Sequence, residues 1–152
     1  MLFGILSPAR RFLTKDEAAQ LANLVKMQEA RSSGEIRIYI ESHCPTIDPS
    51  VRAKNIFTQL RMHQTQLRNG VMIYIAFRDH DFALLGDTGI FHKAPADFWH
   101  REAKHLAKHF HHKNHLEGLS HCIKAIGDLL EQHFPPQATP RNELPDDIVF
   151  GR

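Results

Sequence analysis

Arg68-Asn69-Gly70 opens a near-continuous apolar run, Val71 to Phe77, which is the stretch that decides the fold. An apolar run of roughly six to eight residues between turn signals is typical of a strand buried on both faces. The polar residues Arg78-Asp79-His80 interrupt the run, and the shorter apolar segment Asp81 to Leu85 precedes the glycine-bracketed Gly86-Asp87-Thr88-Gly89. We therefore predict a buried strand over 71–77 and a hairpin to a shorter antiparallel strand.

A second strand is predicted upstream, over residues 36–41, because its isoleucines alternate with polar or amphipathic residues. Between the two strands, Asp48-Pro49 begins a helix that is expected to reach residue 62. A strand, a helix and a second strand in this order form a parallel crossover. Three more amphipathic helices are predicted, from the capping box at Thr14 to Glu17 as far as Arg31, from Pro95 to Lys113-Asn114, and from Leu116 to just before Pro135-Pro136.

Four helices around so small a sheet must cover both of its faces. The predicted fold is therefore α/β, a three-layer α/β/α sandwich with a small mixed central sheet. A length of 152 residues is sufficient for one domain with a substantial core. We expect that single domain over 1–136, followed by an extended or partly disordered tail over 137–152.

Composition excludes several classes of protein. A net charge of +2 is too small to indicate binding to nucleic acid. No apolar run approaches the roughly 18 residues of a transmembrane helix, and the apolar start of the chain is shorter than the core of a signal peptide. Two cysteines, Cys44 and Cys122, provide no disulfide framework. We therefore expect a cytoplasmic protein.

The order of segments resembles the TPM domain family, to which a thylakoid acid phosphatase linked to photosystem II repair belongs. The resemblance runs from Leu13 to Phe134, and its motifs open the two parallel strands at Ser33-Gly34-Glu35 and at Arg68-Asn69-Gly70. Short members without a signal peptide, which end in an Asn-Glu-Leu-Pro-Asp tail (here Asn142 to Asp146), are the most similar. Such members accompany a longer, exported TPM protein and a LemA-type membrane protein. The resemblance therefore implies a protein partner associated with a membrane.

Acid phosphatase activity and calcium binding are the chemical properties that the resemblance implies. Calcium-binding members use aspartates near the loop after the third strand. The present chain departs from exported members there, because Gly86-Asp87-Thr88-Gly89 is followed by Ile90 to Ala94 and the downstream carboxylates are missing. A hard cation such as calcium needs several oxygen ligands.

Three loops are predicted to meet at one end of the sheet, because two of them open the parallel strands and the third closes the antiparallel strand. We call this the glycine-loop end; it gathers the ligand-binding candidates Ser33, Glu35, Arg68, Asn69, Asp87 and Thr88. Glu35 and Asp87 could bind a metal, and Arg68 with loop amides could bind a phosphate. The alternative is that the glycines only make turns and that Arg68 forms an ion pair with Glu35 or Asp87.

The opposite end of the sheet carries Glu41 to Cys44 and Arg78 to Asp81, at the carboxyl ends of the parallel strands, where open α/β sheets usually bind ligands. Helical spacing places three histidines, His105, His109 and His112, on one flank of the third helix. They could bind zinc or nickel adventitiously. A solvated basic face is the alternative, because no cysteine or carboxylate completes a ligand set.

Two functions remain open from the sequence. The first is a non-catalytic accessory domain that binds a protein partner in membrane-protein maintenance. The second is a metal-dependent acid phosphatase of the calcium type that acts through Glu35 and Asp87 at the glycine-loop end. The enzyme needs several converging carboxylates, whereas this end offers two. The accessory function is therefore favoured.

Overall fold

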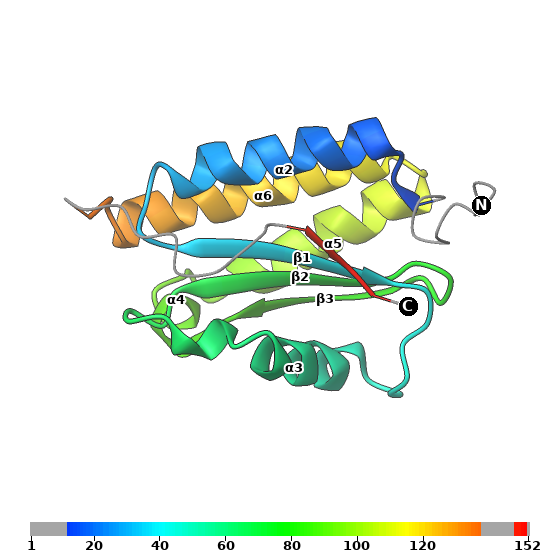
Figure 1. The fold of residues 1–152 in the computed structure, drawn as a ribbon, viewed down its shortest axis with the longest axis horizontal. Coiled ribbons are helices and arrows are strands. Elements are labelled where there is room, and N and C mark those ends of the chain that lie inside the picture. Colours follow the sequence, from blue (N-terminus) through cyan, green and yellow to red (C-terminus); the bar gives the residue numbers. More distant parts are fainter. Residues whose placement is uncertain (1–11, 138–147, 152) are drawn as a thin grey trace, which may run out of the picture.

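The computed structural model describes residues 12–137 and 148–151 and forms three layers (Figure 1). Helices α2 (Lys15–Glu29), α5 (Phe98–His111) and α6 (His115–His133) cover one face of the sheet. Helix α3 (Pro49–Gln59) covers the other face. The predicted α/β sandwich is confirmed. Within the described residues, no helix is both long and apolar enough to cross a bilayer.

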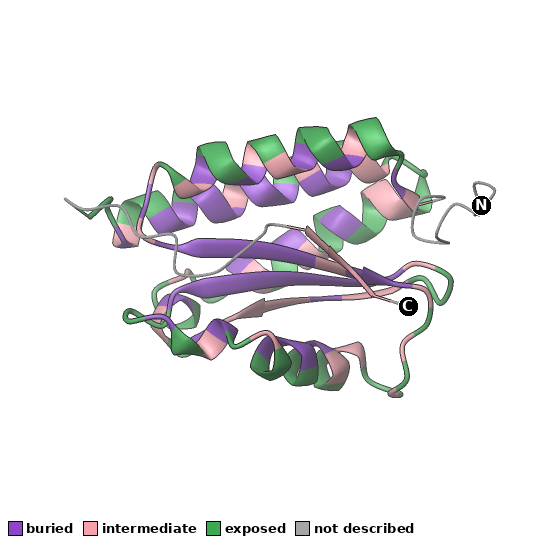
Figure 2. Ribbon diagram, in the orientation of Figure 1, coloured by how far each residue is buried: buried purple, intermediate pink, exposed green. Residues whose placement is uncertain are grey.

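The sheet has four strands in the order β3-β2-β1-β4. Strand β1 (Glu35–Glu41) pairs in parallel with β2 (Gly70–Ala76), which confirms the predicted crossover through α3. Strand β3 (Asp81–Gly86) pairs antiparallel with β2, which confirms the predicted hairpin. Every residue of β2 is buried, as the near-continuous apolar run indicated (Figure 2).

Alternation along the strands divides the interior into two cores. The isoleucines of β1 and β2 that face α2, α5 and α6 pair as Ile38 with Ile73 and Ile40 with Ile75, and all four are at most 1% exposed. The residues between them face α3, where the rings of Tyr39 and Tyr74 stack with centroids 6.2 Å apart. Both faces are thus apolar, which explains why β2 lacks a polar alternation.

The predicted helix boundaries differ most from the structure at the end of α3 and at the start of α5. Helix α3 ends at Gln59 rather than at residue 62, because Arg61 adopts a left-handed backbone (φ 58°) and a short 3-10 helix, Met62–Gln64, follows. Helix α5 begins at Phe98 rather than at Pro95. The Phe98 amide donates to the Pro95 carbonyl at 3.0 Å, so residues 95–98 form a turn that leads into the helix. The capping box of Thr14 and Glu17 is present as predicted.

The C-terminal segment supplies a strand that the sequence analysis did not assign. Strand β4 (Ile148–Phe150) pairs in parallel with β1, with Ile38 opposite Ile148 and Ile40 opposite Phe150. The Gly151 amide donates to the Ile40 carbonyl at 2.7 Å. Residues 138–147, which include the Asn142 to Asp146 motif, lie outside the described residues.

Candidate functional site

The loops of the glycine-loop end meet as the strand directions predict (Figure 1). The Asp87 amide donates to the Gly70 carbonyl at 2.9 Å, and the Gly89 amide donates to the Arg68 carbonyl at 2.8 Å. A short helix, α4 (Thr88–Phe91), begins directly after Asp87. The turn after β3 is therefore folded back against the turn that opens β2, rather than standing free as a loop.

The carboxylate of Asp87 is enclosed by donors. Arg68 holds it through two hydrogen bonds, from Nε to Oδ2 at 2.7 Å and from Nη2 to Oδ1 at 2.8 Å. The Thr88 amide also donates to Oδ1, at 2.7 Å, which caps α4. The Asp87 side chain is only 5% exposed, and this pairing raises the pKa of Arg68. Of the two ion pairs weighed from the sequence, the geometry selects Asp87.

The remaining candidates at this end lie on β1 and before β2. The Asn69 side chain is buried, and its amide lies 3.4 Å from the Ser33 hydroxyl. Glu35 is buried on β1 directly opposite Gly70 of β2. Because β2 lies between β1 and β3, the backbones of Glu35 and Asp87 are separated by roughly 10 Å, two strand spacings.

The histidines of α5 gather differently from the prediction. His105 and His109 stack with His121 of α6, and the ring centroids of His105 and His121 are 4.8 Å apart. The ring of His112 instead lies 5.3 Å from that of His111. Within the described part of the chain, no group of three or more histidine, cysteine, aspartate or glutamate side chains is placed to hold a metal ion.

At the opposite end, the loops after β1 and β2 are tied together by Asp79. Its carboxylate contacts the His43 ring nitrogen Nδ1 at 2.8 Å and accepts a hydrogen bond from the Cys44 amide at 2.6 Å. The pairing with His43, followed by the bond from Cys44, lowers the pKa of Asp79. Cys44 and Cys122 are both free thiols, and burial raises the pKa of Cys122, so that thiol is unreactive.

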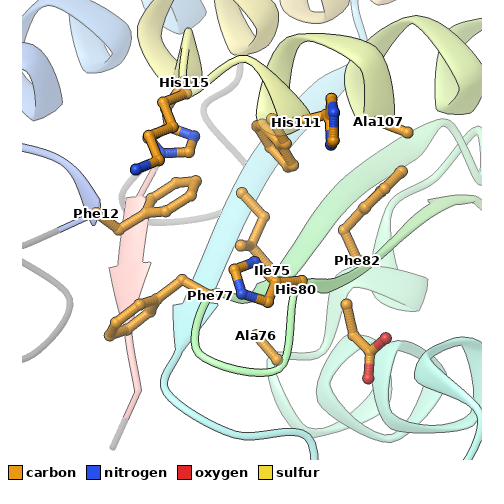
Figure 3. Close-up of a pocket in the computed structure, with 12 residues that line it drawn as sticks. Phe12, Ile75, Ala76, Phe77, His80, Phe82, Ala107, His111 and His115 are labelled. Atoms are coloured by element: carbon orange, nitrogen blue, oxygen red, sulfur yellow. The ribbon is translucent and has the colours of Figure 1, made fainter.

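A cavity of about 550 Å³ opens beside this opposite end (Figure 3). Its walls come from the end of β2, the hairpin, α5 and the connection between α5 and α6. Aromatic rings dominate it: Phe110 makes edge contacts with Phe12 and Phe82, with centroids 5.5 and 5.6 Å apart. The Phe12 ring also lies 4.3 Å from that of His115. The cavity is largely apolar, and its volume is in the range of small-molecule binding sites.

A family model described as the TPM domain matches residues 8–129 of the chain. The chain belongs to the TPM domain family. It is similar to the BA42 protein of the psychrophilic bacterium Bizionia argentinensis, whose NMR structure superimposes with a TM-score of 0.83 at 35% identity, over 92% of this chain and 96% of that one. The N-terminal domain of the cg2496 protein from Corynebacterium glutamicum shares the fold alone, with a TM-score of 0.63 at 8% identity over 86% and 82% of the two chains. No curated protein matches the chain.

The residues of this TPM domain do not fit the calcium site that the family resemblance implies. Calcium takes about six to eight oxygen ligands. Asp87 is the carboxylate nearest the expected position, and both of its oxygens already accept hydrogen bonds from Arg68. Glu35 lies on another strand, with β2 in between. A cation would have to displace the Arg68 guanidinium and would still find a single carboxylate at Asp87.

A pH dependence of stability follows from His115 of this TPM domain. Burial lowers the pKa of His115 below its usual value of 6.5; nearby Glu17 opposes this effect, and His80 and Lys113 add to it. The unfolded chain then binds a proton that the folded chain does not, so stability falls as the pH drops through about 6.5. Between about pH 7.5 and about pH 5.5, we expect the melting temperature of His115→Gln to fall by less than that of the wild type.

His112→Gln is the control for this measurement, because His112 is exposed at the end of α5. The control is expected to keep the wild-type slope. Equal slopes in the His115 variant and the wild type would contradict the prediction.

Sequence reasoning missed the cavity, although it named individual residues that line it. His80 lies in the predicted hairpin loop, and Phe110 lies within the helix predicted from Pro95 to Lys113-Asn114. No sequence pattern singles out Phe12, His111 or His115. No linear pattern joins these residues, because they come from separate segments that meet only when α5 packs across the hairpin.

Proposed function

We propose that this TPM domain is a non-catalytic accessory module that binds a protein partner in the maintenance of membrane proteins. The family membership and the similarity to BA42 support the domain type. The role of a partner-binding module rests on the chemistry of the glycine-loop end.

The Arg68–Asp87 pair is the observation that carries the proposal. A metal-assisted phosphatase needs carboxylates that hold a metal, activate water and polarise a phosphoryl oxygen. Here the Asp87 carboxylate is directed to Arg68 and to the Thr88 amide, which stabilise the turn after β3. Asp87, one of the two carboxylates that would serve catalysis, therefore serves to shape this surface.

Two exposed apolar side chains stand on that surface. Leu67 is 41% exposed and Phe91 is 50% exposed, and we call them the apolar pair. The bond from the Gly89 amide to the Arg68 carbonyl holds α4 against the segment that carries Leu67. The Phe91 ring stacks on Trp99 with centroids 6.0 Å apart, so it is presented in a fixed orientation. Aromatic side chains held in this way are typical anchors of protein interfaces.

Site-specific photo-cross-linking tests the proposal. A photoreactive phenylalanine analogue is placed at Phe91 and, as a control, at Ile47, an apolar position in the loop before α3 that is even more exposed. In membranes and lysate from cells that express the protein, we expect one protein adduct of defined mass from position 91 and none from position 47. A Leu67→Ser substitution should reduce the yield of that adduct about tenfold, as loss of an interface anchor does.

Two results would overturn the proposal. Identical adducts from positions 91 and 47, or none from either, would show that the apolar pair binds no specific partner. Calcium-dependent hydrolysis of p-nitrophenyl phosphate that disappears in the Glu35→Gln, Asp87→Asn double variant would instead establish the phosphatase.

A further inference from the structure

The cavity beside the hairpin is separate from the glycine-loop end. It lies where β2 ends, whereas the apolar pair flanks the residues before β2 and after β3. Ligands of open α/β sheets usually bind beyond the carboxyl ends of parallel strands, which is where this cavity opens. The cavity shares no residue with the glycine-loop end or the apolar pair, so binding at one site is independent of the function of the other.

The body of the cavity is suited to an apolar group. Ile75 and Phe77 contribute from the end of β2 and the residue after it, Phe82 from β3, and Phe12 from the segment before α2 (Figure 3). Phe110 contributes from α5. Four aromatic rings around about 550 Å³ offer a surface from which water is easily displaced. An acyl chain of medium length or a fused aromatic ring would match this space.

The polar groups around the cavity indicate the head group of its ligand. Lys113, His80, His111 and His115 supply nitrogen donors, whereas Asp81 is the one carboxylate among the lining residues. Lys113 carries one permanent positive charge, which matches a single negative charge better than the two charges of a phosphate monoester. Lys113 and Asp81 carry one charge each, of opposite sign. It is therefore the nitrogen donors at Lys113 and His115, and not the net charge of the lining, that favour a monovalent anion.

His115 supplies an independent observation. Its ring lines the cavity, yet its Nδ1 atom is buried and has no hydrogen-bond partner within the described part of the chain. Buried polar atoms are nearly always paired, and an unpaired one is unfavourable for stability. A ligand head group could bond to this nitrogen once the imidazole ring turned toward the cavity.

We propose that the cavity binds a small amphipathic carboxylate, with the apolar body among the phenylalanine rings and the carboxylate near Lys113 and His115. Decanoate and decanol are the probes that test it, because they share an apolar chain and differ in charge. In titrations of the labelled full-length protein followed by amide NMR, we expect decanoate to shift the signals of Phe82, Ala107 and Phe110. We also expect decanoate to bind at least about fivefold more tightly than decanol, as for one partly exposed ion pair.

Two substitutions test separately the apolar part of the cavity and the polar groups that would bind the carboxylate. Ala107→Trp would fill the space from the exposed side of α5, and we expect it to weaken decanoate binding more than tenfold. Ala96→Trp is the bulk control, since Ala96 is exposed and does not line the cavity. Lys113→Gln should weaken decanoate threefold to fivefold, while the exposed Lys104→Gln on the same helix layer should leave its affinity unchanged.

Three outcomes would overturn the proposal. Shifts spread over the surface, or confined to the glycine-loop end, would show that the cavity is not the site. Unchanged affinity in Ala107→Trp, with the melting temperature of the wild type, would show the same. Equal binding of decanol and decanoate would show that the site does not select a carboxylate.

Discussion

Replacing Arg52 with methionine is expected to destabilise the fold by about 3 kcal/mol, because it leaves a buried carboxylate without its countercharge. Glu41, at the end of β1, is 5% exposed and receives two hydrogen bonds from Arg52 of α3, from Nε at 2.8 Å and from Nη2 at 2.9 Å. The Tyr74 hydroxyl donates to the same carboxylate, and burial together with this bond raises the pKa of Tyr74. Urea unfolding of the variant and the wild type measures the loss.

A double variant distinguishes a lost charge pair from lost packing. In Glu41→Gln, Arg52→Met the buried charge is gone, while the glutamine oxygen can still accept the Tyr74 hydroxyl. We expect the double variant to regain at least half of the stability that the single variant loses. If it is no more stable than Arg52→Met, the Arg52 side chain contributes through packing on α3 and not through its charge.

The sequence predicted the elements whose signals are local. The continuous apolar run of β2 and the alternating isoleucines of β1 each indicate which residues of the strand are buried. Both strands are present in the structure as predicted. The crossover and the hairpin determine the strand directions, so the sequence alone predicts that Ser33, Asn69 and Asp87 lie at one end of the sheet.

Features that depend on tertiary packing could not be predicted in the same way. Strand β4 has only three residues, too few to give a sequence signal. They form a strand because they pair with the edge of β1 that β2 leaves free. His121 stacks with His105 and His109 because α6 packs along α5. Spacing within a single helix instead predicts His112 as the third histidine of the cluster. The charges of Arg68, Glu35 and Asp87 were visible in the sequence, but only the fold decides which carboxylate the guanidinium reaches.

The glycine that follows Thr88 is expected to be as sensitive as the buried ion pair. A Cβ atom on Gly89 would meet the Leu67 carbonyl oxygen and would lie 2.6 Å from the Arg68 carbonyl oxygen. Both obstacles are backbone atoms of the turn that opens β2, so neither can rotate away. We expect Gly89→Ala to destabilise the protein by about 3 kcal/mol, the upper range for overpacking, and to shift the NMR signal of the Arg68 side chain as α4 moves.

Gly86→Ala is the matched control for the close approach. A Cβ atom at Gly86 would lie 2.7 Å from the edge of the Trp99 ring, which belongs to a half-buried side chain on α5. That ring can move by a few tenths of an ångström, so the loss is expected to be smaller, about 1 kcal/mol. The difference in stability between Gly89→Ala and Gly86→Ala therefore distinguishes a clash with fixed backbone from a clash with a movable side chain. If both alanine variants unfold at the same urea concentration, the contact between α4 and the Leu67–Arg68 backbone is loose enough to admit a Cβ atom, and the surface that presents Phe91 is not rigid.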